Sequence, residues 1–522
     1  MKTCINRFAS FAFVERNLAQ GGLFPYNNAC SRLHAFPVSR SYMPMLSYRY
    51  NTACSCSSPF PLLKSVFALR FGQRLKSLVS TCVFPLLKST FASVRDRLYC
   101  WLERGSGPFL RCLPFFFACI LALAFVYPSQ LTAQRLPRVS PKSAGMDALR
   151  LRYADEAIEQ AIADKEIPGA VLAVVRHGKM AYLKAYGNKR VYPYTEPMSV
   201  NTVFDLASCS KSVSTAISAM ILIERGKLRL LDPVERYIPG FKGWNSNDGR
   251  QKRSIRIVDL LTHTSGLPAY ASVNMLVQKY GAPNPDSLMH YIAACRREFE
   301  PQTDCRYSCL NFITLQHVIE HVSGESLREF ASANIFRPLG MKHTDYMPLN
   351  ADGRPRSDAS IPLSVIAPTE KTETGDVLCG QVHDPLARVM NAGVSGNAGL
   401  FSCAGDLAIL CAALQNGGVW KGRRILSPLG VRAMRNIPLS AALFGRALGW
   451  DNSSPYASNK GDLFGPQTYG HTGYTGTSLI IDPESDTSVI LLANAVHPTD
   501  NHSVVRLRSL VANAVAASII RP

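Results

Sequence analysis

The sequence predicts an α+β fold, in which a central antiparallel sheet is flanked by helices and a mostly helical region is inserted into it. Two strand patterns lie close together at 167–175 and 179–186, and two more lie at 477–481 and 487–492. Between them, the chain beyond residue 232 is rich in loops and helical patterns. Because strand patterns occur at both ends of this segment, we expect both ends to contribute to one sheet.

The first helix is expected over residues 144–164, which form an amphipathic pattern. Its apolar positions are expected to include Leu149, Tyr153, Ile158 and Ile162. The first two strands are separated by His177-Gly178, which predicts a hairpin. The next helix follows residue 208 and ends at Gly226, with one apolar stripe made of Val213, Ile217, Met220 and Ile221.

Later elements are predicted in the same way. A helix is expected over 313–322, and residues 483–486 form a turn between the two late strands. A final amphipathic helix is expected over about 504–519. This order, with helix and strands before the helical middle and strands and helix after it, supports a single sheet.

The composition is that of a chain that can bury a large core, with 47% hydrophobic and 18% charged residues among 522. The net charge of +20 is unevenly distributed. Residues 1–135 hold 16 of the 57 Lys and Arg residues but only 3 of the 37 acidic residues, and the remainder has a balance of only +7. The basic charge therefore gives no reason to expect a nucleic-acid partner for the folded part.

The chain divides into three segments. Residues 1–108 show no sustained period of 3.6 or 2 and are interpreted as a basic extension of low order. Residues 109–134 have a basic start, an apolar centre at 113–126 and small residues near Ala133, as is typical of a secretory signal peptide. The apolar centre is shorter than the roughly 20 residues that a membrane-spanning helix needs. Residues 135–522 are expected to form the globular domain of an exported, periplasmic or secreted protein.

A signal peptide belongs at the N-terminus, yet this one follows a long extension. Our hypothesis is that residues 1 to about 100 come from a start assigned too early. No Met lies between Met45 and Met146, so the true start would be a non-Met codon shortly before Arg111. The alternative is a genuine extension whose uncleaved apolar segment anchors the protein in a membrane. N-terminal sequencing or intact mass of the exported protein distinguishes the two.

Cysteine usage gives no support for a metal site, and no cofactor is expected. Seven of the 15 cysteines follow residue 120, without a CxxC pair or a His/Cys cluster of zinc spacing. These seven are Cys209, Cys295, Cys305, Cys309, Cys379, Cys403 and Cys411. Cys305 can pair with Cys309, or either with Cys295, and an odd number leaves at least one free thiol.

The clearest chemical pattern is Ser208-Cys209-Ser210-Lys211 at the start of a helix. Residues i and i+3 share a helix face, so the Lys211 amine can reach the Ser208 hydroxyl. A serine needs such a neighbour to become a nucleophile, and the free N–H groups at a helix N-terminus favour the negative charge that develops. The pattern alone is common, because many helices begin with a capping Ser and carry an exposed Lys.

Two later segments supply partners. Arg306-Tyr307-Ser308-Cys309 precedes the helix at 313–322, and Gly470-His471-Thr472-Gly473-Tyr474 precedes the late strands. Ser-x-x-Lys, then a Tyr motif, then Lys/His-Thr-Gly is the ordered trio of penicillin-recognising serine enzymes. The chain resembles the beta-lactamase-related serine hydrolase family over roughly residues 140–515. The segments 204–208, 260–268 and 391–402 also resemble that family.

The resemblance implies a beta-lactamase/transpeptidase-like fold and a role for each matching residue. Ser208 would attack the acyl carbonyl, Lys211 would ease its deprotonation, and Tyr307 would shuttle the proton. His471 would stand where beta-lactamases and carboxypeptidases have Lys and where the esterase and aminopeptidase branches often have His. It would line the cleft and bond the substrate carboxylate. The backbone N–H groups of Ser208 and Tyr474 would form the oxyanion hole, and Gly473 and Cys309 would line the substrate site.

One position departs from the family pattern. The second motif is usually Tyr-x-Asn, and Cys309 occupies the third position. Together with His471, this favours an esterase, D-peptidase or cell-wall fragment hydrolase over an efficient beta-lactamase. The alternative is a penicillin-binding protein that is acylated at Ser208 and turns over slowly. The expected partner is a small-molecule, peptide or cell-wall-derived acyl substrate. His263 and His383-Asp384 are expected to be structural hydrogen-bonding groups, and the Cys209 side chain is expected to pack away from the nucleophile.

Overall fold

The computed structural model describes residues 135–521, and the extension and the signal-like segment lie outside this range. The central sheet has six antiparallel strands in the order β11-β12-β13-β1-β2-β3. Their bounds are β1 Gly169–Arg176, β2 Lys179–Arg190, β3 Glu196–Pro197, β11 Tyr469–Thr472, β12 Ser478–Asp482 and β13 Thr487–Ala493. Strands from both ends of the described segment therefore form one sheet, as predicted, because β1 pairs with β13 from Ala170–Ala493 to Arg176–Thr487.

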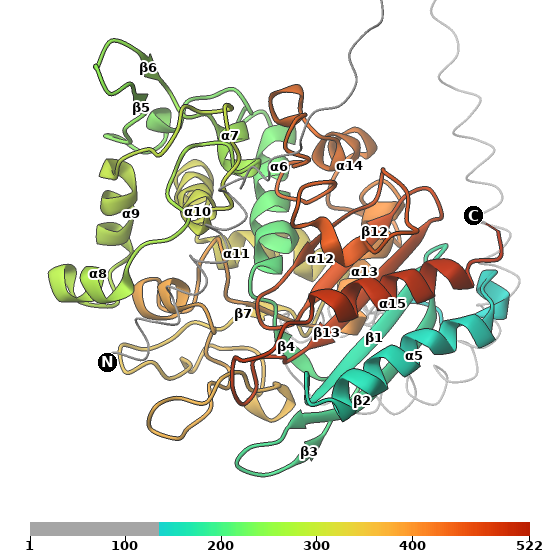
Figure 1. Cartoon of the computed structure of the whole chain (residues 1–522). Helices are drawn as coiled ribbons and strands as arrows, with labels where there is room; N and C mark the ends of the chain where they lie inside the picture. Colours follow the sequence, from blue (N-terminus) through green and yellow to red (C-terminus); the bar gives the residue numbers. More distant parts are fainter. Residues whose placement is uncertain (1–134, 522) are drawn as a thin grey trace, which may run out of the picture. The chain divides into compact units, whose positions relative to one another are not determined.

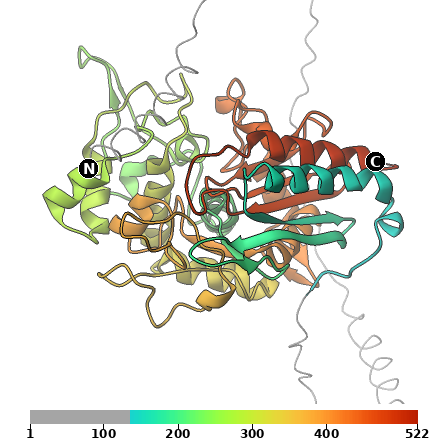
Figure 2. The ribbon, with the colours of Figure 1, turned by 60° about the horizontal axis from the view of Figure 1, so that its bottom comes forward.

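The first strand is central and buried at all eight positions. Its side chains alternate between two cores, as a strand with covered faces requires. Ala170, Leu172 and Val174 pack with α5 (Ala148–Ala163) and α15 (Val505–Ser518). Val171, Ala173 and Val175 pack with α13 (Ala404–Gln415) on the opposite face. Figure 1 shows α5 and α15 lying side by side across the sheet, and Figure 2 shows the same pair from another side.

The hairpin between β1 and β2 turns at His177-Gly178, as predicted. Both residues have positive φ, 50° and 65°, which a two-residue hairpin turn with matching twist requires. The predicted first helix is partly wrong. It begins at Ala148 with Asp147 as its N-cap, and Leu149 and Tyr153 are exposed. Its buried positions are Leu151, Ala154, Ile158 and Ala161, so two small alanines join Leu151 and the predicted Ile158 on the face that meets the sheet.

Helices and short strands make up the region between β3 and β11 (Figure 1). Besides α13, the α-helices are α6 Ile217–Glu224, α7 Ile257–Leu261, α8 Val273–Tyr280, α9 Pro285–Ala294, α10 Cys309–Ser323, α11 Leu327–Ala331, α12 Arg337–Leu339 and α14 Pro428–Arg435. A three-stranded sheet joins β4 (Val203–Asp205), β8 (Leu400–Cys403) and β7 (Asp345–Tyr346). Two small ribbons are formed by β5 Trp244–Asn245 with β6 Lys252–Arg253 and by β9 Val419–Trp420 with β10 Arg423–Arg424.

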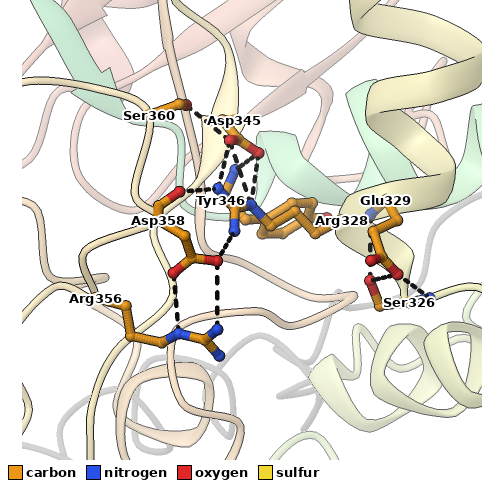
Figure 3. A network of polar contacts seen from close by, with 8 residues as sticks. All are labelled: Ser326, Arg328, Glu329, Asp345, Tyr346, Arg356, Asp358 and Ser360. Carbon is orange, nitrogen blue, oxygen red and sulfur yellow. Dashed lines mark hydrogen bonds and ion pairs between the residues drawn. The ribbon is translucent and has the colours of Figure 1, made fainter.

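An ion-pair network ties α11 to β7 and to the loop that follows (Figure 3). Arg328 bonds Asp345 at 2.9 Å and Asp358 at 2.8 Å, and Arg356 bonds Asp358 at 3.0 Å. Such linked charges hold a loop better than isolated surface pairs do. The network braces the three-stranded sheet whose strand β4 leads into Ser208.

In the described part of the chain, all seven cysteines are free thiols, so no pairing among Cys295, Cys305 and Cys309 is present. Across residues 135–521 no helix is both long enough and apolar enough to cross a bilayer.

Candidate active site

The turn before Ser208 is strained. Ala207 has a φ of 45°, a left-handed conformation that is unfavourable for a residue with a side chain. The buried Asp205 carboxylate holds it by accepting the Ala207 N–H at 2.8 Å and the His383 N–H at 2.7 Å. Strain of this kind persists only where surrounding contacts enforce it, and it is concentrated at functional sites. The turn leaves Ser208 partly accessible between buried neighbours.

Ser208 and Lys211 are brought together as the sequence predicts. The Lys211 Nζ lies 3.0 Å from the Ser208 Oγ and donates to the Asn397 carbonyl at 2.9 Å. Lys211 is fully buried, and it opens a π-helical segment, Lys211–Ala216, that continues into α6. Burial acts to lower the pKa of Lys211, but interactions with Cys309, Tyr307 and the Asp384 carboxylate together raise it. We therefore take Lys211 as a cation at neutral pH.

Tyr307 lies immediately before α10, in the same cluster. Its ring centre is 5.0 Å from the Lys211 Nζ, and it stacks on His263 with ring centres 4.5 Å apart. Burial raises the pKa of Tyr307, and the Lys211 charge and hydrogen bonding with Ser208 oppose that rise. Its hydroxyl accordingly keeps its proton in the resting site.

His263 supports Tyr307 from the turn after α7. Its Nδ1 accepts the Ser308 N–H at 3.0 Å and lies 3.1 Å from the Asn311 Nδ2. Burial lowers the pKa of His263 well below its usual value, so the ring is neutral. The sequence predicts a structural histidine here, and the stacked ring shows which residue it supports.

Cys309 replaces the asparagine of the usual motif and lies beside the lysine. Its Sγ is 3.7 Å from the Lys211 Nζ. Burial raises the pKa of Cys309, so this group is a neutral thiol. The position that carries an amide in the Tyr-x-Asn motif therefore carries a weak hydrogen-bonding group, and the Asn397 carbonyl serves as a strong acceptor for Lys211.

His471 lies on the edge strand β11, with its ring centre 6.1 Å from that of Tyr307. Its Nδ1 is 2.8 Å from the Thr472 carbonyl. A carbonyl only accepts, so Nδ1 carries the proton and Nε2 presents a lone pair. Burial, then the charges of Lys211 and Arg446, lower the pKa of His471 to about 3. His471 is thus an uncharged acceptor, unlike the lysine found at this position in beta-lactamases.

The turn after β11 docks against the chain just before Ser208. Gly473 N–H donates to Thr477 O at 2.7 Å, and Thr477 Oγ1 donates to Leu206 O at 3.0 Å. A side chain at Gly473 would collide with Leu206 O, so the close approach needs glycine. The Tyr474 backbone is thereby held near the nucleophile turn.

The Tyr474 side chain turns outward from this loop. It is 47% exposed, its hydroxyl donates to Asp500 at 2.5 Å, and its ring stacks on His383 at 5.7 Å. His383 is therefore a structural group, as predicted. Cys209 is fully buried under β11, with its Sγ 3.5 Å from His471 O, and its pKa is raised by burial to about 12. This thiol packs and does not face the site.

Sequence reasoning missed four residues of this site. They are Asn397, Arg446, Tyr456 and Arg508. Asn397 lies in the glycine-rich stretch that resembles the family, but its contribution is a backbone carbonyl, which no side-chain motif reveals. Arg446 and Tyr456 lie in a loop-rich segment without a recognisable motif. In the part of the chain that the structure describes, no group of His, Cys, Asp and Glu side chains is arranged to hold a metal ion.

Comparison with known proteins places the chain among serine hydrolases. The family model described as Beta-lactamase matches residues 154–513. "Putative D-alanyl-D-alanine carboxypeptidase" of Escherichia coli strain K12 is 32% identical over 380 residues, covering 69% of this chain and 86% of that protein. "N-acetylmuramyl-L-alanine amidase" of Bacillus subtilis strain 168 is 32% identical over 420 residues, covering 75% of this chain and 93% of that protein.

Solved structures agree on the fold. "EstCE1, a hydrolase with promiscuous acyltransferase activity" has a TM-score of 0.56 at 24% identity, covering 70% of this chain and 99% of that one. A class C beta lactamase from Rhodobacter sphaeroides has a TM-score of 0.54 at 21% identity, covering 71% of this chain and 100% of that one. The fold is the predicted beta-lactamase/transpeptidase-like α+β fold.

The chain belongs to the beta-lactamase family of serine hydrolases. As a serine hydrolase, it is an enzyme that acts on ester or amide substrates.

Proposed function

We propose that this enzyme hydrolyses an amide or ester bond in a peptide or cell-wall-derived fragment, with Ser208 as its nucleophile. The observation that carries the proposal is the 3.0 Å contact between the Ser208 Oγ and the Lys211 Nζ, with Tyr307 enclosed beside them. Two relatives of about one-third identity bear names of enzymes that act on cell-wall peptides or their amide links, which supports this substrate class.

Each side chain has a role in the proposed reaction. The Ser208 Oγ attacks the acyl carbonyl, and the Lys211 charge stabilises the oxygen as its proton leaves. Tyr307 accepts that proton on its oxygen and passes its own hydroxyl proton to the leaving group. In deacylation, water gives its proton to Tyr307, and Tyr307 returns one to the Ser208 Oγ. Tyr307 is neutral before and after each relay, and its oxygen carries partial negative charge while its own proton is in transit.

The developing oxyanion is stabilised by the backbone N–H groups of Ser208 and Tyr474. Removing one such donor typically costs on the order of 3 kcal/mol of transition-state stabilisation. The contacts of Gly473 and Thr477 with Leu206 hold the two backbone segments together.

The protonation state of His471 restricts the class of substrate. With Nδ1–H bound to Thr472 O, its Nε2 accepts a hydrogen bond and carries no charge. We infer that it receives an N–H or O–H of the substrate and does not pair with a carboxylate. This favours an amide or ester inside a larger fragment over a substrate anchored by a terminal carboxylate at this position.

The cell-wall-related names of the relatives also support an exported protein. Within that location, we propose that residues 109–134 are a cleaved signal peptide, which intact mass of the exported protein tests.

The deciding experiment compares wild type with Ser208→Ala on a chromogenic acyl ester. A panel then covers esters, D-amino-acid peptides, cell-wall fragments and beta-lactams. We expect steady turnover by wild type, its loss in Ser208→Ala, and preference for a cell-wall fragment or ester over beta-lactams. A single stoichiometric burst supports the slow-turnover penicillin-binding alternative. Turnover that survives in Ser208→Ala contradicts the proposed nucleophile.

A further inference from the structure

A buried arginine that belongs to none of the family motifs lies against Tyr307. Arg446 is only 2% exposed. Its guanidinium carbon lies 5.4 Å from the centre of the Tyr307 ring and 5.1 Å from that of Tyr456. The two tyrosine rings are themselves 5.7 Å apart. A guanidinium is planar and weakly hydrated, so it packs against aromatic rings while keeping its charge.

Arg446 is held in register with the strand that carries His471. Its Nη1 lies 3.3 Å from the Asp451 Oδ2. Asp451 in turn accepts the Ser454 hydroxyl at 2.8 Å, and its backbone exchanges hydrogen bonds of 2.9 and 2.8 Å with Gly470. The position of the guanidinium is therefore fixed by β11 itself, one residue from His471.

The guanidinium is incompletely satisfied. Within residues 135–521 its Nε and Nη2 are buried without an oxygen or nitrogen partner. Asp451 pairs with Nη1, and the thiol of Cys305, a weak acceptor, also interacts with the guanidinium. Burying a charged donor group in this way is unfavourable for stability. An arginine kept there despite that cost indicates a use for its charge, and the neighbour that it contacts is Tyr307.

The charge of Arg446 acts on both histidines that contact the Tyr307 ring. Its charge contributes, after burial, to the lowered pKa values of His263 and His471. The charged and titratable groups that face Tyr307 from the surrounding elements are Lys211, His263, Cys309, Arg446, Tyr456 and His471. Among them the two histidines are neutral, so the cations facing the ring are Lys211 and Arg446.

We propose that Arg446 is a positioning residue that acts through Tyr307, because its guanidinium holds the ring and, with Lys211, stabilises negative charge on the phenol oxygen during proton relay. This inference rests on the acyl-enzyme mechanism proposed above. The two cations have different roles. Lys211 contacts the nucleophile, whereas Arg446 contacts the relay residue Tyr307 and sets how readily it gives up its proton.

The test is the pH profile of kcat/KM for wild type, Arg446→Lys and Arg446→Met on an acyl ester. Removal of a nearby cation makes neighbouring groups hold their protons more tightly. We expect Arg446→Met to lower kcat about 10- to 100-fold with little change in KM. We also expect it to move the profile to higher pH by about one unit. Arg446→Lys retains the charge and is expected to stay near the wild-type profile.

Two further variants separate this effect from misfolding and from His471. Arg446→Met leaves the buried Asp451 without its cationic partner. The double variant Arg446→Met/Asp451→Asn removes both charges. It is expected to fold and to show the same shifted pH profile as Arg446→Met. The shift is also expected to persist when Arg446→Met is made in a His471→Gln background. Stoichiometric labelling of Ser208 by a fluorophosphonate reports the fraction of folded sites.

If kcat falls in Arg446→Met but the pH profile of kcat/KM does not move, the inference is overturned and Arg446 is a structural group only. A shift that disappears in the His471→Gln background also overturns it, because the charge would then act through the histidine. These results differ from failure of the proposed function, which shows as turnover that survives in Ser208→Ala.

Discussion

At the residue scale, the candidate site depends on two backbone positions beside the reacting groups. Ala207 is held at a φ of 45°, and Gly473 lies against Leu206. The first turns the Ser208 hydroxyl to a partly accessible position. The second brings the turn after β11 close enough for the proposed oxyanion hole. Neither position is a catalytic group, yet both set where the catalytic groups lie.

Gly473→Ala is predicted to lower kcat/KM by about 100-fold. The added Cβ would collide with the Leu206 carbonyl and the Thr477 hydroxyl, and backbone cannot yield as a flexible side chain can. The turn would move by roughly an ångström, which is enough to misplace an oxyanion donor. Steady-state kinetics on an acyl ester measures the loss. Gly422→Ala is the control, because a Cβ there meets nothing within 4 Å, although its φ of 77° adds backbone strain. Equal activity of Gly473→Ala and wild type would contradict the close approach.

At the element scale, the C-terminal helix does more than cover the sheet. Arg508 extends from α15 and donates to Gly473 O and Thr477 O, at 2.6 and 3.0 Å. Burial lowers the pKa of Arg508 to about 10, so it is still a cation at neutral pH. The last helix thus braces the turn that contributes Tyr474 to the site.

Arg508→Met is predicted to destabilise the fold by about 1–3 kcal/mol, because the hydrogen bonds from the buried guanidinium to two carbonyls are lost. The variant is also expected to lower kcat by a larger factor than it raises KM, because the turn that carries Gly473 is no longer held by Arg508. Urea unfolding and steady-state kinetics measure the two effects. Arg506→Met is the matched control, because Arg506 is an exposed arginine on the same helix. A similar loss in both variants would show that the brace is unimportant.

At the scale of the whole molecule, the site is assembled where the sheet meets the helical region. Ser208 and Lys211 lie at the start of the segment leading into α6, Tyr307 lies before α10, and His471 lies on β11. Lys211 and His471 are buried in this junction, and Ser208 and Tyr307 are partly exposed, so the site is poor in water except at the nucleophile and the tyrosine. The neutral state of His471 follows from that burial and from two nearby cations.

Buried neutral histidines make the fold sensitive to acid. His471 has a folded-state pKa of about 3, below the value near 6.5 of an unfolded chain. Below pH 6.5 the unfolded state binds a proton that the folded state does not, so stability is lost as the pH falls from 6.5 towards 3. Between pH 7 and pH 5, His471 alone lowers the free energy of unfolding by about 2 kcal/mol. His263 acts in the same direction.

The prediction is checked by urea unfolding at pH 7 and pH 5. The free energy of unfolding of wild type is expected to fall between pH 7 and pH 5. In His471→Gln it is expected to fall by about 2 kcal/mol less than in wild type. Comparing the variants cancels the contributions of other titrating groups. An identical loss in both would mean that His471 is protonated in the folded protein.

Several features were predictable because they rest on local chemistry. The 3.0 Å contact of Ser208 with Lys211 follows from the spacing of three on a helix, and the hairpin at His177-Gly178 follows from residues that accept positive φ. The sheet built from both ends follows from apolar strand patterns at both ends. Helix α5 was predicted correctly at Ile158 and wrongly at Leu149 and Tyr153, because periodicity does not say whether Leu149 or Ala154 meets the sheet.

The sequence by itself determined the family, the fold class and the order of the motifs, because these are written in residue types and spacings. Only the tertiary structure decided which groups are charged and what holds them. Asn397 contributes a carbonyl, Arg446 lies against Tyr307 from a segment without a motif, and His471 loses its charge through burial. These properties depend on long-range contacts and on exclusion of water, which no local pattern encodes.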